Sequence, residues 1–502
     1  MAQQLQNITI RAPAFKGLNT QDSPIDGDPS FASVADNCII DQYGRIGARK
    51  GFDTQTDDVT ALGGESIVVM AELEETDGTR TVLSAGNNKL FTGTTALTDV
   101  TGAHTITDDN WQMVPFNQDI YLVQSGYNPL VYNGTSVVAI GSHTGASGTA
   151  PQANCALGAF GRMWMADTAT DKSTVYWSDL LIGAAWSGGT SGSINLSKVW
   201  PDGYDEITAL AAHNGFLVIF GKRSIILYQG AESPATMALA DTINGIGCVA
   251  RDSVQPTGTD LIFLSHVGVQ SLGRVIQEKS APMRDISKNI RNDLFSVVSA
   301  AGVNINSAYS AENAFYLLNF PTLNTLYCFD TRGALEDGTL RVTRWPNTGF
   351  KCFLRRDNGD FLIGSALGIG KYNTYYDDGE TYLMEYLSNS LSFGDAARTK
   401  ILKKIKPTLI GGSGTVANIK WSYNYSDNYT GQAITLGSSV PAYFGTAQYS
   451  IGTYSGGVKI NTPNINSTGN GTVVNVGLDI PINGTEFSIQ ELNIQALIGR
   501  ML

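Results

Sequence analysis

The stretch FLVIFGKRSIILYQG, Phe216–Gly230, has the pattern of a β-hairpin and indicates how much of the chain folds. Apolar residues fill positions 216–220 and 225–228, and the short turn GKRS separates them. Apolar runs of this length, bounded by turn residues, predict strands. The dipeptide Asn214-Gly215 stands directly before the first strand and favours a tight turn, because both residues tolerate a positive φ. One small sheet cannot cover both of its own faces, so such a hairpin needs neighbouring sheets.

The same pattern recurs as an apolar strand, a short turn, and a second strand that ends in an aromatic residue or leucine. The anchor residues of the seven units are Phe91, Tyr132, Trp177, Tyr228, Leu272, Phe329 and Tyr372. Successive anchors lie between 41 residues apart (Phe91 to Tyr132) and 57 residues apart (Leu272 to Phe329). This is the span of a four-stranded propeller blade.

These repeats predict an all-β chain whose residues 56–376 form a β-propeller of about six blades, with seven allowed. An array of β-sandwiches with irregular spacing is the alternative. After Tyr376 the texture changes to short alternating strands rich in Gly, Ser, Thr and Asn. We expect residues 377–502 to form a separate antiparallel β-sandwich or tip domain. We expect residues 1–55 to be an arm and hairpin that closes or braces the propeller.

One helix is expected over residues 280–301, SAPMRDISKNIRNDLFSVVSAA. Ile286, Ile290, Leu294 and Val298 recur every four residues, which is the spacing of one helix face. Asp285 is the expected N-cap. We expect this helix to pack outside the sheets, between two blades.

The composition narrows the function classes. The 502 residues are 42% hydrophobic, only 16% charged, and carry a net charge of −12. Free nucleic-acid binders are usually basic, so sequence-specific DNA reading is not expected. A channel through which DNA slides should make few Lys or Arg contacts with phosphate, because each such contact adds affinity.

Neither a leader nor a disulfide framework is expected. Cys38, Cys155, Cys248, Cys328 and Cys352 are odd in number and widely spaced, so we expect buried free thiols in a reducing compartment. The opening residues MAQQLQNITIRAPAF lack the long apolar segment of a signal peptide. No stretch is long and apolar enough for a transmembrane helix, so no membrane segment is expected.

The search for catalytic motifs predicts no enzyme, no metal and no cofactor. His104, His143, His213 and His266 are not arranged as zinc ligands, and the chain has neither a nucleophile elbow nor a phosphate-binding loop. Paired carboxylates for glycoside hydrolysis stay open, because such residues meet only in the fold. One basic cluster has two readings, a solvated strand or a contact with an acidic subunit or a nucleic-acid backbone; it comprises Arg398, Lys400, Lys403, Lys404 and Lys406.

Several stretches carry a resemblance. The opening FKGLNTQDSPIDGDPSFASVADNCIIDQYGRIGARKGF is similar to the N-terminus of phage tail structural proteins. The middle of the chain matches in pattern and order through EITALAAHNGFLVIFGKRSIILYQG, RDISKNIRNDLF and SAYSAENAFYLLNFPTLNTLYCFDTRG, followed by Trp345. Together they resemble the tail nozzle or hub proteins of short-tailed bacteriophages, also called packaged-DNA stabilisation proteins. The resemblance covers roughly Phe15 to Tyr372, and no catalytic signature is part of it.

The resemblance implies a structural virion protein of the tail, assembled in the host cytoplasm. Such proteins form a homo-oligomeric ring, typically of six copies, that retains packaged double-stranded DNA and provides the channel for its ejection. A head-to-tail adaptor, tail fibres or spikes, and a plug are the partners it implies. On this reading the hairpin at Asp36–Thr54 braces the propeller. Arg45, Arg49 and Lys50 serve a contact between subunits, and Lys400, Lys403, Lys404 and Lys406 are further interface candidates.

Two other functions stay open. A carbohydrate-binding tail adhesin would expose aromatic residues on sandwich loops, and Tyr423, Tyr425 and Tyr429 are its candidates. A carbohydrate-active propeller enzyme would gather carboxylates at the axial mouth of the propeller, with a raised pKa on one of them.

Overall fold

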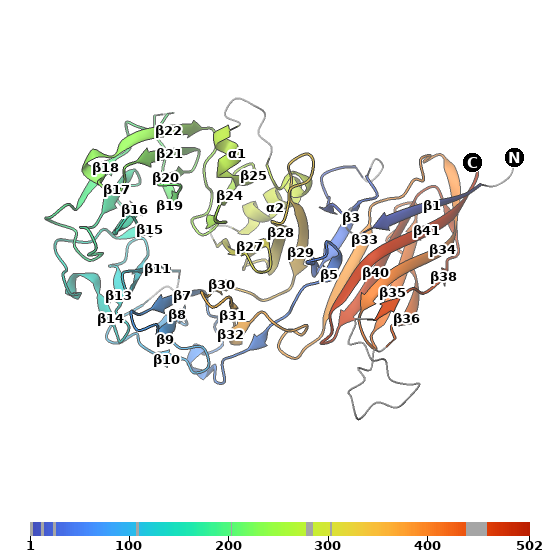
Figure 1. Cartoon of the computed structure of the whole chain (residues 1–502), viewed down its shortest axis with the longest axis horizontal. Helices are drawn as coiled ribbons and strands as arrows, with labels where there is room; N and C mark the ends of the chain where they lie inside the picture. Colours follow the sequence, from blue (N-terminus) through green and yellow to red (C-terminus); the bar gives the residue numbers. More distant parts are fainter. Residues whose placement is uncertain are drawn as a thin grey trace.

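The structure is a computed structural model, and Figure 1 shows a ring of small sheets joined to a second body of long strands. It describes residues 4–11, 15–23, 27–106, 110–201, 203–277, 285–301, 304–437 and 459–501. The ring is the predicted propeller, and the second body is the predicted sandwich.

Six small sheets of the ring, counted over the described residues, are blades of their own. Blade 1 comprises β7 (Val69–Glu74), β8 (Arg80–Gly86), β9 (Lys89–Thr92) and β10 (Thr98–Asp99). Blade 2 comprises β11 (Gln112–Phe116), β12 (Asp119–Val123), β13 (Leu130–Tyr132) and β14 (Val137–Ala139). Blade 3 comprises β15 (Ala153–Ala159), β16 (Arg162–Thr168), β17 (Thr174–Trp177) and β18 (Gly192–Asn195).

Blade 4 comprises β19 (Ile207–His213), β20 (Phe216–Gly221), β21 (Ser224–Gln229) and β22 (Ala238–Asn244). Blade 5 comprises β23 (Gln255–Pro256), β24 (Leu261–Ser265) and β25 (Gly268–Ser271). Blade 6 comprises β30 (Cys352–Arg355), β31 (Phe361–Ser365), β32 (Gly368–Lys371) and β6 (Asp53–Thr54).

The ring has a further member between blades 5 and 6, which we call the shared segment. It consists of β26 (Asn306–Ser310), β27 (Phe315–Phe320), β28 (Thr325–Asp330) and β29 (Arg341–Pro346). Its first strand, β26, contacts β23 on one side and β30 on the other. At its far edge, β29 continues into the sandwich through β3. The propeller of about six blades is therefore confirmed, with the ring completed by one end of a larger sheet.

The repeat anchors mark one strand type. Phe91, Tyr132, Trp177, Tyr228 and Phe329 lie on β9, β13, β17, β21 and β28, the third strand of each unit. The two others, Leu272 and Tyr372, directly follow β25 and β32. All seven side chains are buried. The repeat can be recognised in the sequence because each blade packs the same strand against its neighbour. Blades 3 and 4, for example, share one buried core.

The second body is a sandwich of two sheets. The outer sheet contains β1 (Gln4–Arg11), β4 (Cys38–Ile40), β5 (Ile46–Ala48), β34 (Arg398–Gly411), β37 (Ile460–Asn461), β38 (Ile465–Asn466), β39 (Asn470–Gly471) and β41 (Phe487–Met501). The mixed sheet contains the shared segment, β2 (Gly17–Leu18), β3 (Phe31–Asp36), β33 (Tyr382–Ser388), β35 (Val416–Tyr423), β36 (Thr430–Thr435) and β40 (Val474–Ile482).

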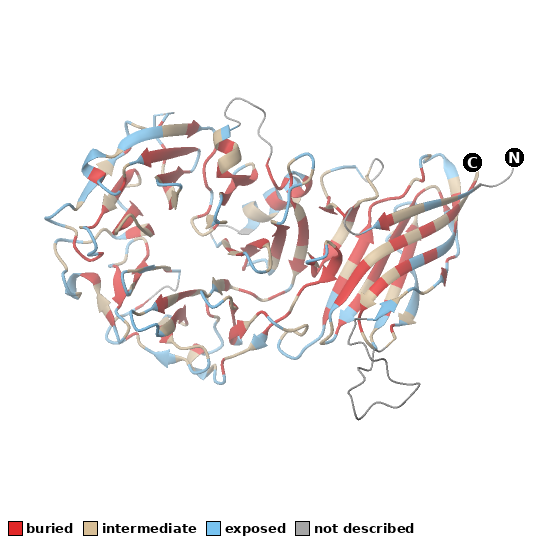
Figure 2. Cartoon of the chain, viewed as in Figure 1, coloured by how far each residue is buried: buried red, intermediate tan, exposed pale blue. Residues whose placement is uncertain are grey.

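The core of the sandwich lies between these sheets. Ile405 of β34 and Ile494 of β41 belong to the same buried cluster as Tyr386 of β33 and Leu478 of β40. Buried residues recur along each long strand in Figure 2, with half-buried and exposed residues between them. This alternation is that of strands with one face in a core.

The first 55 residues are divided between the two bodies. β6 pairs with β32 and so supplies the outermost strand of the last blade. β1, β4 and β5 instead join the outer sheet, and β3 joins the mixed sheet between β29 and β33. The hairpin β4–β5 therefore belongs to the sandwich, and only the short strand after it pairs within a blade.

Two α-helices occur in the described residues. α2 (Arg291–Ala301) follows a short 3-10 turn at Lys288–Ile290, and residues 280–284 of the expected helix lie outside the described residues. The four residues of the expected face do pack together, since Ile286, Ile290 and Leu294 are buried in one cluster with Val298 against it, but only Leu294 and Val298 lie in α2. Asp285 does not cap the helix, which begins six residues later. The sequence did not predict α1 (Leu272–Gln277). No helix in the described part of the chain is long and apolar enough to cross a membrane.

Candidate functional site

The junction between propeller and sandwich is built around one arginine. Arg49 follows β5, and its side chain is 1% exposed. Its Nε donates to Asn37 Oδ1 at 2.8 Å, and its Nη1 and Nη2 donate to the two carboxylate oxygens of Asp377 at 2.8 and 2.5 Å. Such two-pronged pairing fixes both distance and orientation. Arg49 therefore joins the N-terminal hairpin to the segment that leads from the last blade into β33.

Aromatic rings enclose this ion pair. The guanidinium carbon lies 4.1 Å from the ring centre of Tyr382, 5.7 Å from that of Trp345 and 5.8 Å from that of Phe350. Tyr382 comes from the sandwich, whereas Trp345 and Phe350 belong to the ring core with Tyr372. Burial alone would lower the pKa of Arg49, but the bonds to Asp377 outweigh it and raise the pKa. The arginine stays charged and bridges the two cores.

The chain approaches itself closely beside this arginine. A Cβ placed on Gly51 would lie 1.7 Å from the backbone oxygen of Tyr376, so only glycine fits. The Lys50 amide donates to the Tyr372 hydroxyl at 3.0 Å. The propeller and the sandwich therefore meet at Arg49, Lys50 and Gly51, which are the RKG of the opening hairpin.

The other predicted interface residues fall into two groups. Arg45 is buried and pairs with Asp41 at 2.6 Å, and Lys50 is half-buried. The structure thus gives Arg45 and Arg49 contacts inside the chain in place of the intersubunit contact that the sequence suggested, because little of either side chain reaches the surface. Lys400 is likewise fully buried and donates to the Asp395 carbonyl, which leaves it no surface for a partner.

Lys403, Lys404 and Lys406 are exposed on β34 of the outer sheet. Lys404 stands opposite Gln495 and Asn466, and Lys406 stands opposite Asn493. On β1 the same face continues with Asn7 opposite Gln495 and Thr9 opposite Asn493. The exposed lysines therefore sit in a surface of amides and hydroxyls, and they are not packed into a dense basic belt.

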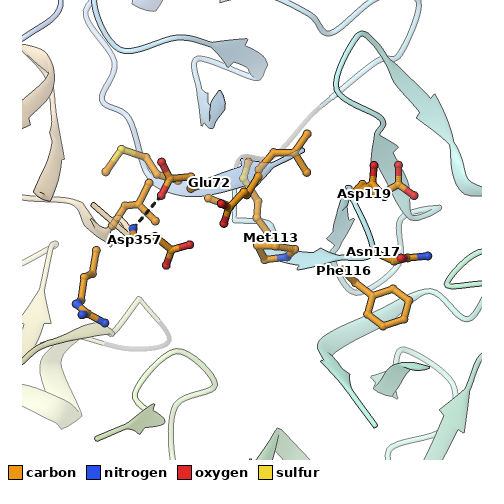
Figure 3. Close-up of a pocket in the computed structure, with 14 residues that line it drawn as sticks. Glu72, Met113, Phe116, Asn117, Asp119 and Asp357 are labelled. Carbon is orange, nitrogen blue, oxygen red and sulfur yellow. Dashed lines mark hydrogen bonds between the residues drawn. The ribbon is translucent and has the colours of Figure 1, made fainter. Parts of the chain in front are cut away.

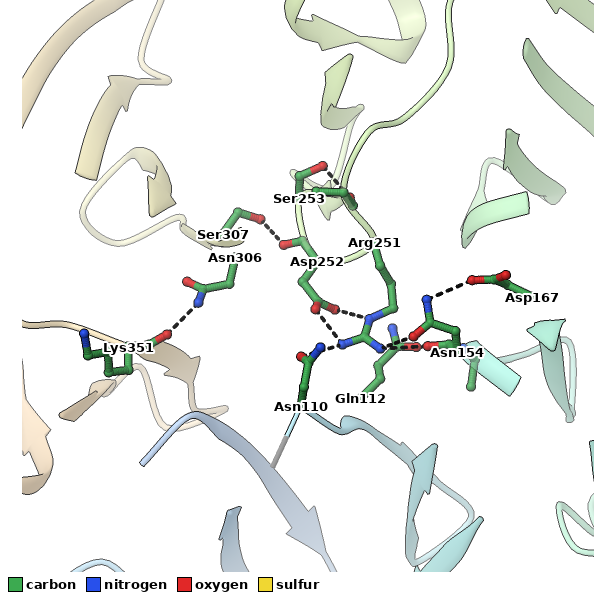
Figure 4. A network of polar contacts seen from close by, with 12 residues as sticks. Asn110, Gln112, Asn154, Asp167, Arg251, Asp252, Ser253, Asn306, Ser307 and Lys351 are labelled. Carbon is green, nitrogen blue, oxygen red and sulfur yellow. Dashed lines mark hydrogen bonds and ion pairs between the residues drawn. The ribbon is translucent and has the colours of Figure 1, made fainter. Parts of the chain in front are cut away.

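A polar network crosses the ring axis at the end where the first strands of the blades begin (Figure 4). Arg251 donates through Nε and Nη2 to Asp252, and through Nη1 to the Asn154 carbonyl at 2.7 Å. Burial alone would lower the pKa of Arg251, but the Asp252 carboxylate more than offsets this and raises it. Ser307 donates to the Asp252 carbonyl at 2.8 Å. The network ties blades 3 and 5 to the shared segment, and its residues line a pocket of about 260 Å³ at this end of the ring.

The sequence did not single out Arg251. Its partners lie 97 residues away in Asn154 and 141 residues away in Asn110, so no local spacing reveals them. The one signal in the sequence is that Arg251 and Asp252 are adjacent and lie between two strands. Such a pair is typical of a buried charge with its partner.

The opposite end of the axis holds an open cavity of about 470 Å³ (Figure 3). The ends of β7, β11 and β30 line it, which shows that the first strands run parallel around the axis. Most of its acids are paired. Arg356 donates to Glu72 at 2.6 Å, and Arg80 donates to Glu74 at 3.0 Å.

Asp119 differs from these carboxylates. Burial raises its pKa despite the His143 Nε2 atom 3.3 Å from its Oδ2. Figure 3 places Asp119 at one side of the cavity and Glu72 with Asp357 at the other. A carboxyl with a raised pKa among others is what the enzyme alternative requires, so we retain it as a candidate acid.

The tyrosines of the adhesin alternative lie near the end of β35. Tyr423 is half-buried and donates to the Thr468 carbonyl at 3.0 Å. The Tyr429 ring centre lies 5.2 Å from Lys420 Nζ. Tyr425 is 47% exposed and has a positive φ of 60°. Of the three, Tyr425 presents the most open ring.

The described residues contain no group of His, Cys, Asp and Glu suited to a metal ion. All five cysteines are buried free thiols. Burial raises the pKa of Cys248 to about 11 and raises those of the other four thiols as well. Thiols of this kind are poor nucleophiles.

Comparisons with known proteins identify no family. No family model matches the chain, and no curated protein matches it. Among solved structures, YCF48 bound to D1 peptide is 11% identical and aligns 62% of this chain with 92% of its own, at a TM-score of 0.32. Kluyveromyces lactis Hsv2 is 12% identical over 53% of this chain and 83% of its own, at 0.31. The AfRom2 CNH domain is 10% identical over 65% and 97%, at 0.38. These likenesses concern the fold alone and carry no argument about function.

Proposed function

We propose that this chain is a structural virion protein that forms the ring-shaped tail nozzle of a short-tailed bacteriophage. In this role it retains packaged DNA and provides the channel for its ejection. The observation that carries the proposal is the Arg49 junction, a buried ion pair that fastens the propeller to the sandwich. A wall element that resists internal pressure needs such a fixed angle between its parts.

The remaining features support the same role. The Arg251 network links blades 3 and 5 and the shared segment across the ring, and in this proposal DNA passes between copies and not through one propeller. The outer sheet presents amides and hydroxyls with the exposed Lys403, Lys404 and Lys406 among them, so it would offer DNA few phosphate contacts. Acidic net charge keeps the remaining surface unattractive to DNA. The adaptor, the fibres or spikes, and the plug are the partners this role requires.

The test is the assembly state of the purified chain. Mass photometry across a concentration series should show a concentration-dependent oligomer, and negative-stain images should show closed rings, six copies being the expected number. A chain that stays monomeric at every concentration would remove the basis of the proposal.

Two other functions each rest on one observation. The exposed Tyr425 ring favours a carbohydrate-binding adhesin, for which a Tyr425→Ala variant should lose binding to host glycans. The raised pKa of Asp119 favours a carbohydrate-active enzyme. For that function an Asp119→Asn variant should lose hydrolysis of host polysaccharide, whereas the nozzle proposal expects no hydrolysis by either form.

A further inference from the structure

The propeller exposes three consecutive aliphatic residues, which we call the apolar knob. Leu180, Leu181 and Ile182, in the loop between β17 and β18, are 50%, 58% and 39% exposed. Single exposed apolar residues are ordinary, but a contiguous exposed set rimmed by polar groups marks an interaction surface.

The knob is held in place by the fold. The Leu181 amide donates to the Gly161 carbonyl at 2.8 Å, and Asn117 Nδ2 donates to the Leu181 carbonyl at 2.8 Å. Leu181 has a φ of +60°, a backbone conformation that disfavours side chains with a Cβ. A leucine kept in a strained, fully bonded turn while its side chain faces solvent points to a role for that side chain.

A second apolar feature lies between α2 and blade 5, and we call it the apolar groove. Its volume is about 200 Å³. Phe295 and Val249 at its rim are 61% and 43% exposed. Its lining is mainly apolar and comprises Val249, Leu264, Val267, Leu294, Phe295 and Val298, with His266 and Arg291 at the edge.

The knob and the groove lie on opposite faces of the propeller. The knob is bonded to the turns that follow β11 and β15, at the end where the first strands finish. The groove includes the β24–β25 turn, which follows a second strand and therefore lies at the other end.

The two faces also differ in charge. Turns after the first strands carry Glu75, Asp77, Asp260, Glu312 and Asp357. The opposite face carries charges of both signs in pairs: Lys172 with Asp167, Lys222 with Glu206 and, beside the groove, Arg291 with Asp285 at 2.7 Å. The knob thus sits on an acidic face, whereas the groove lies on a face whose bases are paired with acids.

We propose that the apolar knob of one copy docks into the apolar groove of the next copy, head to tail. The charges favour this pairing over knob against knob, which would bring two acidic faces together. A contact between two different surfaces of the same chain is heterologous, and it closes into a ring when the rotation between copies allows. This inference rests on the proposed ring and assigns its subunit contact.

The first experiment measures assembly of Leu181→Asp and Phe295→Asp by mass photometry. Each substitution places a charge in the contact, and each should raise the dissociation constant of the assembly at least about 30-fold, as loss of a central apolar contact does. The matched control is Leu239→Asp, which alters a leucine that is 47% exposed on the outer strand of blade 4 and should assemble like the wild type. Thermal melting of all four proteins checks that the fold is intact.

The second experiment tests the direction of the contact. Leu181→Cys and Phe295→Cys are made as separate chains and oxidised alone and mixed. A covalent dimer should form only in the mixture, and the native thiols stay silent because all five are buried. A dimer from Leu181→Cys alone would overturn the head-to-tail contact.

The outcomes separate this inference from the proposed function. If the wild type forms rings and both Asp variants still do, the knob–groove contact is wrong and the nozzle proposal stands. If the wild type never assembles, both fail. Loss of rings in both Asp variants with retention in the control supports the contact.

Discussion

The propeller and the sandwich use the chain in opposite ways. Blades 1 to 5 are each a consecutive stretch of sequence, such as β19–β22 in blade 4, and only blade 6 takes a strand, β6, from a distant part of the chain. The outer sheet instead joins β1 to β41, so that Ile8 pairs with Ile494. One body is therefore local and repetitive, whereas the other is closed by the two ends of the chain. The Arg49 junction connects the two, because it fastens the propeller to the sandwich.

Removing the junction arginine should have the largest effect. Arg49→Met leaves Asp377 without its buried partner and should destabilise the protein by about 3–5 kcal/mol, because a broken buried pair leaves an uncompensated charge. Both bodies should respond, which hydrogen exchange of propeller and sandwich peptides would show as faster exchange in each. The control is Arg355→Met, whose partner Glu312 is 41% exposed and whose loss should cost below about 1 kcal/mol. A change confined to one body would contradict a rigid junction.

Core truncations should then distinguish the two bodies. Ile219→Ala in blade 4 and Ile405→Ala in the sandwich each remove a fully buried side chain and should cost about 2–5 kcal/mol. Ile219→Ala should accelerate hydrogen exchange in blades 3 and 4, which share a core. Ile405→Ala should accelerate it at both chain ends together, in β1 and β41. Faster exchange spread evenly through the molecule in both variants would contradict the proposed difference between the propeller and the sandwich.

These differences also explain which parts of the structure the sequence could reveal. Phe91, Tyr132 and Trp177 revealed their blades because a repeated unit leaves the same letters at a regular spacing. The sandwich was visible only as a change in texture. Nothing near Ile8 says that its partner is Ile494, since register between distant strands is set by the folded core.

The candidate sites show the same limit. Arg49 stood out in the sequence, but its partner Asp377 lies 328 residues away in a stretch that reads only as a turn. The exposure of the predicted interface lysines could not be predicted either, because Lys400 is buried and Lys404 is exposed although both lie on the same strand. The apolar knob, LLI within DLLIG, was not predicted because three apolar residues in a loop have the same pattern as the end of a strand.

Acid should weaken one contact between the shared segment and blade 6. Hydrogen bonds from Arg355 lower the pKa of Glu312 from its usual 4.5 to about 2. Its stabilising contribution is therefore present above about pH 4.5 and is lost as the pH falls toward 2. Both side chains are more than a third exposed, so the effect should stay within about 0.2–1 kcal/mol. Denaturant melts of wild type and Glu312→Gln between pH 2 and 7 measure it, and the variant should lack this part of the pH dependence.

The exposed lysines should matter least for folding. Neutralising Lys403, Lys404 and Lys406 together, each to Gln, should change the free energy of unfolding by less than about 0.5 kcal/mol. Any weak binding to duplex DNA at low salt should fall, and the slope of log affinity against log salt should decrease by at most about 3. Tight binding at physiological salt in the wild type would contradict a polar face along which DNA slides.

The most direct test of the central claim is to find the chain in a virus particle. Immunogold electron microscopy of the particles produced by a phage whose genome encodes this chain should place the label at the tail, below the head, on every particle. Label on the fibres would favour the adhesin. Complete absence from particles, together with turnover of a polysaccharide by the lone chain, would contradict the account.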